Sequence, residues 1–296
     1  MLNYILLLIS LALGTGKNLF SKWGEKSFGS LSGLMSVNIL TSLLAVLVFA
    51  VSGAHLSAAD PLFLVLALLY GALTLGSQSF YITAVKGGSV AICSLIYAAS
   101  FILPTVYSVI RTHESVPLTK AGGILLMMLA VVLVSLKQKS GTDIAAQKGG
   151  SRIWLAFLAM LCAGSVGIIQ KVFGGRYPSE MLNTFLLMAF LSMLVFSLLG
   201  KLAAALCARK TDAPRLRYDR HFLLPAILLA LCVVFANRLN LLLVAALPGI
   251  VFFPLINGGT IMLSAVGSGV FFHEKIIRRT WIGILIGLVA IVLIAL

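Results

Sequence analysis

Charged residues are scarce in this chain, and acidic residues are the scarcest. Only 10% of the 296 residues are charged and 8 are Asp or Glu, whereas 60% are hydrophobic and the mean hydropathy is +1.11. This composition excludes an ordinary soluble protein. A membrane span needs about 20 largely apolar residues, so spans take up most of the chain and leave no room for a sizeable soluble domain.

Acidic side chains are absent from the middle of every apolar segment. All eight lie in polar loops or at segment ends, at Glu25, Asp60, Glu114, Asp143, Glu180, Asp212, Asp219 and Glu274. Carriers of hydrophobic cations and many proton relays place a carboxylate at the membrane midplane, and a metal-dependent membrane enzyme needs a convergent Asp, Glu and His cluster. We therefore expect neither kind of protein, no enzymatic activity, and no cofactor or metal.

Cysteine is also rare. Cys93, Cys162 and Cys232 lie within apolar segments, and Cys207 lies in a basic loop. No two of them have the spacing of a metal site or of a disulfide framework. We expect them to pack as small apolar side chains.

Long apolar segments are abundant. Ten of them are long enough to cross a bilayer, at about 2–20, 31–52, 61–81, 89–110, 119–136, 152–172, 181–200, 222–243, 249–272 and 280–296. The first has neither the basic start nor the small-residue cleavage site of a signal peptide. We predict that all ten are helices, because the runs show no barrel-type alternation and only a helix or a closed barrel satisfies the backbone in lipid.

The net charge of +14 is unevenly distributed. Most lysines and arginines lie in the loops that follow odd-numbered segments, and those of the opposite side are chiefly Arg111, Lys120, Lys171 and Arg176. This bias is the positive-inside pattern and not a nucleic-acid footprint. It predicts a lipid bilayer as the surroundings, no nucleic-acid partner, and both termini outside the cytoplasm of a cell (plasma or inner) membrane.

The dipeptide His113-Glu114 recurs 160 residues later as His273-Glu274, just before the last apolar segment of each half. At the same offset, Gly123-Ile124-Leu125 matches Gly283-Ile284-Leu285. Each repeat contains five segments, which is an odd number, so the second repeat must enter the membrane the opposite way up. Inverted repeats of this kind are typical of carriers that alternate access to a midplane site.

The predicted fold is an all-α integral membrane protein with ten transmembrane helices in two inverted five-helix repeats. We place repeat 1 at 1–138, a polar connector at 139–151 and repeat 2 at 152–296. No coupling ion or oligomeric state is readable, although a monomer or a weak homodimer is expected.

This pattern resembles the drug/metabolite transporter superfamily, specifically its EamA family. Each half has a glycine in its first helix, Gly14 or Gly164, and a glutamate just before its fifth, Glu114 or Glu274. The resemblance covers essentially the whole chain. It implies transport of small metabolites such as amino acids, often outward, through a central cavity lined by both halves. The chain departs from the family at the loop 52–60, which lacks the expected Lys or Arg.

Arg238 is the basic residue farthest inside an apolar segment, and at the repeat offset it matches Gln78. Asn237 and Asn240 are its neighbours on the same turns. A guanidinium that faced the cavity would bind a carboxylate or a phosphate through paired hydrogen bonds. We hypothesise that Arg238 holds the acidic group of a zwitterionic or anionic metabolite. The alternative is that its side chain snorkels toward the outer surface.

Other polar residues within the segments are further candidates for binding substrate. Tyr97 and Asn257 stand at equivalent repeat positions, and the remaining candidates are Thr15, Asn18 and Ser165. Buried amides and hydroxyls between membrane helices more often form packing hydrogen bonds than ligand contacts. Both interpretations stay open at this point.

The repeated His-Glu pair also permits two interpretations. It is either a proton-coupling or gating element, or a helix-boundary device in which Glu114 and Glu274 lie in the first turn of the following helix and complement its macrodipole. Substitution of both glutamates by glutamine would separate the two, since only a coupling role requires the pH dependence of transport to change.

Small residues and prolines suggest how the helices pack. Gly283 and Gly287, together with Gly122-Gly123, predict close packing of the last helices of the two halves. Pro104 and Pro254 predict bends in the fourth and ninth helices. The three tryptophans lie at segment ends, as in an interfacial aromatic belt, at Trp23, Trp154 and Trp281.

The sequence therefore predicts a transporter of a small polar metabolite such as an amino acid or a related carboxylate, and the family resemblance favours export. A sugar or nucleotide-sugar carrier is the alternative within transport, and a non-transporting membrane scaffold is the alternative outside it.

Overall fold

The computed structural model describes residues 2–28, 30–54, 60–87, 90–114, 116–135, 153–207, 219–274 and 276–295. Within these ranges every regular element is a helix, as predicted, and the predicted connector 139–151 lies outside them. The elements are α1 (Leu2–Trp23), α2 (Glu25–Phe28), α3 (Leu31–Val51), α4 (Pro61–Gly87), α5 (Val90–Ala98), η1 (Ala99–Phe101), α6 (Ile102–Arg111), α7 (Leu118–Ser135), α8 (Ile153–Arg176), η3 (Ser179–Met181), α9 (Leu182–Cys207), α10 (Arg220–Ala246), α11 (Gly249–Phe272) and α12 (Arg278–Ala295).

Nine helical segments of the described chain are long and apolar enough to cross a membrane. One of them, Ile92–Arg111, combines most of α5 with η1 and α6. α12 is a further apolar helix of 18 residues. Within a helix the backbone N–H and C=O groups bond to one another. This is required in a membrane, because hydrocarbon offers them no hydrogen-bond partner. The chain is therefore a multi-pass membrane protein.

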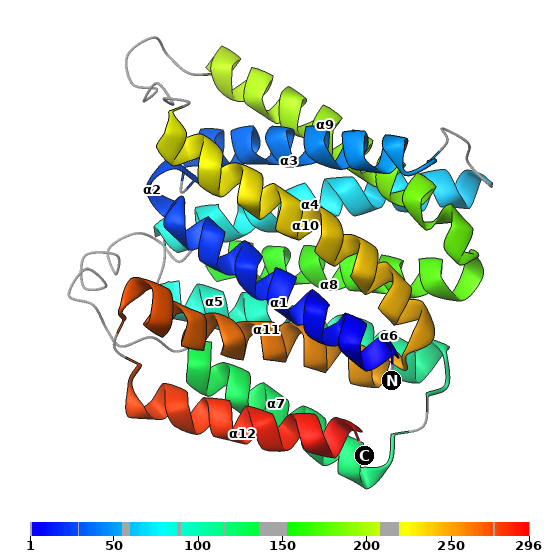
Figure 1. Cartoon of the computed structure of the whole chain (residues 1–296), viewed down its shortest axis with the longest axis vertical. Coiled ribbons are helices and arrows are strands. Elements are labelled where there is room, and N and C mark those ends of the chain that lie inside the picture. Colours follow the sequence, from blue (N-terminus) through cyan, green and yellow to red (C-terminus); the bar gives the residue numbers. More distant parts are fainter. Residues whose placement is uncertain are drawn as a thin grey trace.

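The long helices run between two ends of the molecule (Figure 1). Both chain termini lie at one end, which we call the terminal face, and we call the other end the opposite face. α1 runs from the terminal face to the opposite face, whereas α8 runs the other way (Figure 1). α4, α7 and α11 all begin at the terminal face.

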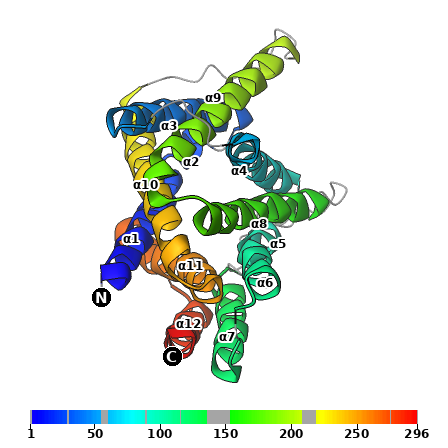
Figure 2. The same cartoon turned by 90° about the vertical axis from the view of Figure 1, so that its right-hand side faces the viewer.

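Helices from the two halves of the chain pack against each other in a paired pattern. α1 contacts α10 and α11, whereas α8 contacts α4 and the α5–η1–α6 segment. α3 packs along α9, and α7 packs along α12 (Figures 1 and 2). This set of contacts stays the same when each first-half helix is exchanged with its second-half counterpart in chain order.

The fourth apolar segment is interrupted, but the ninth is not. A 3-10 turn, Ala99–Phe101, separates α5 from α6, and Pro104 follows as the third residue of α6. Proline has no N–H and its ring crowds the carbonyl four residues earlier, so the helix tightens just before it. Pro254 lies inside the continuous helix α11. A bend was expected at both prolines. The helix is interrupted only next to Pro104, whereas it runs without a break through Pro254.

Aromatic side chains fill the interior near the terminal face. Phe63 of α4, Phe173 of α8 and Phe185 of α9 are fully buried. The ring centroids of Phe173 and Phe185 lie 4.3 Å apart, and Phe63 stands edge-on to Tyr177 at 5.2 Å. Such pairs contribute about 0.5–1.5 kcal/mol each beyond burial. Because lipid is as apolar as these rings, close packing holds the helices together here more than exclusion of water does.

α7 and α12 approach each other closely at glycines, as predicted. A Cβ on Gly123 would lie 2.7 Å from Cγ1 of Ile294, and a Cβ on Gly283 would lie 2.9 Å from Cβ of Leu133. A Cβ on Gly287 would lie closest to Met262 of α11 and 3.3 Å from Cβ of Ala130 in α7. Gly283 therefore serves the contact with α7, and Gly287 serves contacts with both α11 and α7.

The three tryptophans all lie near the opposite face. Trp23 ends α1, whereas Trp154 and Trp281 lie near the starts of α8 and α12 (Figure 1). Each is about half exposed. Half-exposed indoles at helix ends are typical of a membrane–water interface, so they mark the bilayer boundary at this end.

Substitution of Gly123 by leucine should destabilise the protein by about 1–3 kcal/mol, because the new side chain would overlap α12. Gly122 is the matched control, since a Cβ there meets nothing within 4 Å. Thermal unfolding in detergent micelles should show a lower Tm for Gly123→Leu and little change for Gly122→Leu. Equal effects of the two substitutions would contradict close packing at Gly123.

Candidate functional site

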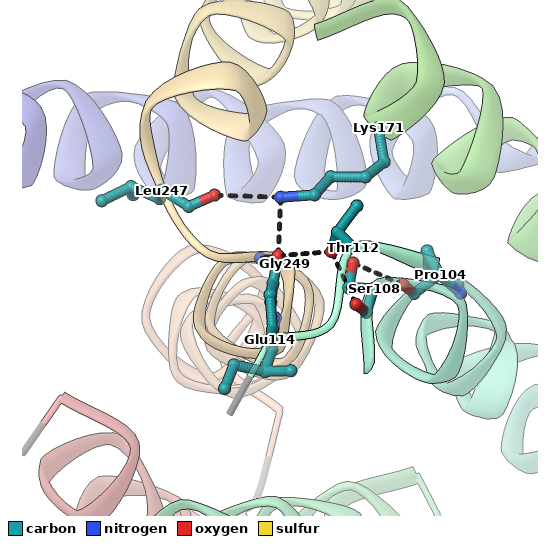
Figure 3. Close-up of polar contacts among 8 residues, drawn as sticks. Pro104, Ser108, Thr112, Glu114, Lys171, Leu247 and Gly249 are labelled. Atoms are coloured by element: carbon teal, nitrogen blue, oxygen red, sulfur yellow. Dashed lines mark hydrogen bonds and ion pairs between the residues drawn. The ribbon is translucent and has the colours of Figure 1, made fainter. Parts of the chain in front are cut away.

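Glu114 lies at the centre of a polar cluster at the terminal face (Figure 3). Its carboxylate accepts hydrogen bonds of 2.9 Å from the backbone N–H groups of both Gly249 and Ile250. It also accepts a hydrogen bond of 3.1 Å from the Thr112 hydroxyl and forms an ion pair of 2.8 Å with Lys171. The Lys171 ammonium also donates to the Leu247 carbonyl at 3.4 Å.

This carboxylate replaces a missing helix cap. The first N–H groups of a helix have no partner within it, and Pro248, the residue that precedes α11, makes no side-chain cap hydrogen bond. Glu114 supplies the acceptor from the other half of the chain, and its negative charge is favourable beside the positive end of the helix macrodipole. One side chain therefore joins α11, α8 and the connection after α6.

The residue before each glutamate turns the chain in the same way. His113 has φ 50° and His273 has φ 53°, which are the only left-handed values of non-glycine residues in the described chain. Asn, Asp and His are enriched in this conformation. The expectation that Glu114 and Glu274 open the following helices is wrong, because α7 begins only at Leu118 and α12 only at Arg278, with no acidic residue in either first turn.

Glu274 forms the counterpart contact at the opposite face, where it pairs with Lys22 of α1. Each repeated glutamate thus binds a lysine from the first long helix of the other half. The two contacts differ in exposure: the Glu114 and Lys171 side chains are 13% and 12% exposed, whereas those of Glu274 and Lys22 are 49% and 24% exposed. The terminal-face contact is nearly buried and the opposite-face contact is not.

The surroundings of Glu114 lower the pKa of its carboxyl group. Burial alone would raise this pKa, but the hydrogen bond and charge of Lys171 and the N–H groups of Ile250 and Gly249 outweigh it. These groups all stabilise the ionised form. The cluster is therefore built around a carboxylate and not around a protonated acid.

A second contact closes the same face. Asp60 is the N-cap residue before Pro61 of α4 and accepts from the N–H of Phe63 at 2.7 Å. It also accepts from the Tyr177 hydroxyl at 2.7 Å and from Arg176 at 3.2 Å. These bonds, that of Tyr177 first, lower the pKa of Asp60. Asp219 caps α10 in the same way at the opposite face, through the N–H of Phe222.

Burial along α1 and α11, which contact each other, changes from one face to the other. The buried residues of α11 end at Met262, ten positions before the helix ends at the opposite face. Those of α1 end at Leu11, in the half of the helix nearest the terminal face. α11 is therefore more deeply buried toward the terminal face and more accessible toward the opposite face. α1 instead carries exposed apolar side chains in its terminal-face half, such as Leu2, Ile5 and Leu8.

Several predicted substrate residues instead form hydrogen bonds between helices. Asn237 accepts from the Tyr70 hydroxyl, which also accepts from Gln170 at 3.1 Å. Asn240 accepts from the Ser10 hydroxyl. The Asn18 amide donates to Ser264 of α11 at 2.9 Å. These bonds join helices of opposite halves, which is the packing role that the sequence left open.

The remaining polar candidates are dispersed. Tyr97 packs against Tyr81 with ring centroids 4.8 Å apart, and the Asn257 amide donates to the Phe253 carbonyl of its own helix. Gln78 and Ser165 are half-buried. Thr15 has a buried hydroxyl without a hydrogen-bond partner in the described part of the chain. Cys93, Cys162 and Cys232 are free thiols.

Arg238 lies on the outward side of α10. It is exposed, and it continues a row of exposed apolar side chains, Leu224, Ile227, Leu231 and Phe235, at helical spacing. It is therefore not brought together with Asn237 or Asn240, which contact other helices. Its exposed side chain lies on the outer side of the α1–α10 pair.

Lys17 of α1 carries a further positive charge, which is not among the substrate-binding residues predicted from the sequence. It follows Ser10 by seven residues and Gly14 by three, so all three share one face of α1. Ser10 bonds to α10 and Gly14 packs on Thr260 of α11, yet the Lys17 side chain is exposed. No carboxylate of the described chain pairs with it. Lys17 thus presents an unpaired charge on an inward face.

Among the described residues, no three His, Cys, Asp or Glu side chains are grouped so as to hold a metal ion. The polar side chains that join described helices of the two halves are amides and hydroxyls, and α1 adds the ammonium of Lys17. Such groups bind and orient a polar molecule through hydrogen bonds and charge.

Comparisons with known proteins identify the fold alone. No family model and no curated protein matches the chain. A solved structure described as "Crystal structure of protein" superposes on it with a TM-score of 0.67 and 13% sequence identity. The match covers 97% of this chain and 98% of the other. The whole helical arrangement therefore recurs in a protein of nearly unrelated sequence.

Substitution of Glu114 by glutamine should lower stability at neutral pH by about 3 kcal/mol, because nearly buried Lys171 would lose its counter-charge. Glu274→Gln is the matched control and should cost less than about 1 kcal/mol, since that carboxylate is half exposed. A carboxyl with a depressed pKa stabilises the fold above its unfolded pKa and loses this effect as pH falls through the folded pKa.

The difference between wild type and Glu114→Gln should therefore shrink in acid. Thermal unfolding in micelles between neutral pH and about pH 3, below the unfolded pKa of Glu, measures it. A pH-independent difference, or equal losses in the two variants, would contradict the proposed ionised cap.

Proposed function

We propose that the chain is a membrane carrier whose ten helices form two inverted five-helix repeats, similar to the EamA family of drug/metabolite transporters. It moves a small polar metabolite with an acidic group, such as an amino acid or a related carboxylate, across the cell membrane. The family resemblance favours efflux. The termini are extracytoplasmic, so the opposite face is the cytoplasmic one.

The observation that carries this function is the unequal pair of glutamate contacts. Glu114 and Glu274 are repeat equivalents at opposite faces, and each pairs with a lysine of the other half. Only the Glu114 contact is nearly buried and also caps a helix. Two equivalent contacts in unequal states are what alternating access requires, because one side must be closed while the other is accessible.

The second state follows from the repeat. Gly249 and Ile250, which Glu114 caps here, correspond at the offset of 160 to Ser89 and Val90, at the start of the fourth apolar segment. When Glu114 releases α11, Glu274 caps that start and the cytoplasmic face closes. Movement between the states exchanges one buried glutamate contact for its equivalent, which keeps the two states close in free energy.

Lys17 is the cation that holds the acidic group of the substrate. It faces inward from α1, it is accessible, and no described carboxylate neutralises it. A substrate carboxylate would supply the missing counter-charge. The neighbouring interhelical amides keep α1 in register with α10 and α11, which fixes the depth of the ammonium. A substrate role for Arg238 stays a prediction that the same experiment tests.

Cysteine labelling tests the two-state mechanism. In a variant whose four native cysteines are replaced by serine, Ser108→Cys reports on the terminal face, because Ser108 is fully buried against Gly249. Ser21→Cys reports on the opposite face, where Ser21 is exposed. Adding Glu114→Gln should raise maleimide labelling of position 108 about tenfold and lower that of position 21, since about 1.4 kcal/mol shifts an equilibrium tenfold.

The reciprocal change separates a global switch from local fraying of the loop. Glu274→Gln is the matched control and should leave position 108 protected. A rise at position 108 with no fall at position 21 would contradict alternating access.

Solute flux tests the function directly. A thermal-shift screen of amino acids, sugars and nucleotides first identifies a stabilising ligand, because a ligand that binds only the native state raises Tm by mass action. Uptake of that ligand into proteoliposomes is then measured. Lys17→Ala should reduce flux of an acidic substrate at least about tenfold, the loss of one charge-assisted contact of about 1.5–3 kcal/mol, whereas Arg238→Ala should retain it.

The other outcomes each assign a different role. Loss of flux in Arg238→Ala alone would place the substrate carboxylate on that arginine. Flux of sugars or nucleotide sugars only would replace the proposed substrate class. Absence of flux for every solute, with the protein correctly folded, would leave a non-transporting scaffold.

A further inference from the structure

A groove on the side of the molecule lies between α1 and α10. It has a volume of about 410 Å³ and is lined by Ile9 and Leu13 of α1 with Phe235, Arg238, Leu239 and Leu242 of α10. Its walls are apolar apart from the guanidinium. Ile9 and Phe235 are 45% and 42% exposed, so the groove opens on the outer side of the helix pair.

The groove faces the lipid and not the interior. On α10 its exposed residues continue the apolar row of Leu224, Ile227 and Leu231, which repeats every three or four positions. Such a row marks one face of a helix. The residues of α10 that contact other helices, Asn237 and Asn240, lie off this face.

Arg238 carries its charge below the membrane surface. It lies eight residues before the end of α10 at the terminal face, which is about 12 Å along a helix that rises 1.5 Å per residue. α10 is longer than the hydrocarbon core of about 30 Å, so the Cα of Arg238 lies within that core. From this depth the long arginine side chain can extend along the groove toward the headgroup layer at the terminal face.

The protein supplies no counter-charge to this guanidinium. No described residue forms an ion pair or hydrogen bond with Arg238. An arginine at the centre of a membrane helix costs about 2.5–3.5 kcal/mol, and Arg238 bears part of this cost unless an anion joins it. A second copy of the chain does not provide one at this depth from its described part, because no described acidic residue lies inside a long helix.

We propose that this groove binds an anionic phospholipid of the leaflet at the terminal face. The lipid phosphate pairs with the Arg238 guanidinium, whose planar fork of N–H donors matches two phosphate oxygens. An acyl chain lies on the apolar wall formed by both helices. Lipid fits the groove better than a soluble anion does, because every other lining side chain is apolar. This site is independent of the proposed transport function.

Binding of phosphatidylglycerol tests the assignment, with phosphatidylcholine of the same acyl chains as the neutral lipid. Native mass spectrometry of the purified full chain counts the retained lipids, and thermal unfolding measures their stabilisation. Wild type should retain phosphatidylglycerol in preference, and Arg238→Gln should weaken that retention about tenfold, in line with one charge-assisted contact. Arg111→Gln, at the exposed end of α6 on the same face, is the matched control and should retain it.

A second variant fills the groove without changing any charge. Leu13→Trp should also lower retention of phosphatidylglycerol while leaving Tm in phosphatidylcholine unchanged, which shows that the fold is intact. Equal retention by Arg238→Gln and wild type would overturn the proposal. Equal protection by glycerophosphate, which has no acyl chain, or stronger protection by a free fatty acid would overturn the choice of phospholipid.

Discussion

Hydrocarbon offers no hydrogen bond to a polypeptide backbone, and the arrangement of this protein follows from that constraint. Helices satisfy their own interior, but their first N–H groups still need an acceptor. At α11 the acceptor is the carboxylate of Glu114, brought from the other half of the chain. Lys171 binds the same carboxylate. The group that caps α11 therefore also joins it to α8 and to the connection after α6.

The few polar side chains within the bundle likewise find their hydrogen-bond partners inside the protein. Tyr70, Gln170 and Asn237 satisfy one another across the two halves, and Ser10 does so with Asn240. Polar groups that form these interhelical bonds are not available to bind a substrate. The ammonium of Lys17 is the exception, since it is inward and accessible and has no described carboxylate beside it. This contrast is the reason for separating residues that hold helices together from the one assigned to substrate.

The sequence predicted the parts of the fold that depend on composition and period. The helical spans followed from apolar runs of membrane length, and the close approach of α7 and α12 followed from Gly123 and Gly283. Directions around a helix were harder to predict. Asn237 and Arg238 are adjacent in sequence, yet successive residues differ by about 100° around a helix of 3.6 residues per turn, so one contacts Tyr70 and the other faces outward. When a helix is apolar on every side, its sequence does not show which residues face other helices and which face lipid.

The lysine that pairs with each repeated glutamate could not be predicted from the sequence either. The repeated His-Glu pair identified Glu114 and Glu274 as notable, but their lysines lie at a different offset, since Lys22 and Lys171 are 149 residues apart. A repeat read at one fixed spacing misses such a pair. The distance between helix ends, set by tertiary packing, decided which lysine each glutamate meets.

Trp23, Trp154 and Trp281 all lie at the opposite face, and the chain has no other tryptophan. Indole rings favour the headgroup layer, so the three tryptophans anchor this end of the protein at a fixed depth in its leaflet. The end with the termini has no tryptophan anchor. A thicker or thinner bilayer is therefore accommodated at the far leaflet, and lipid thickness acts on the Glu114 contact more than on the Glu274 contact.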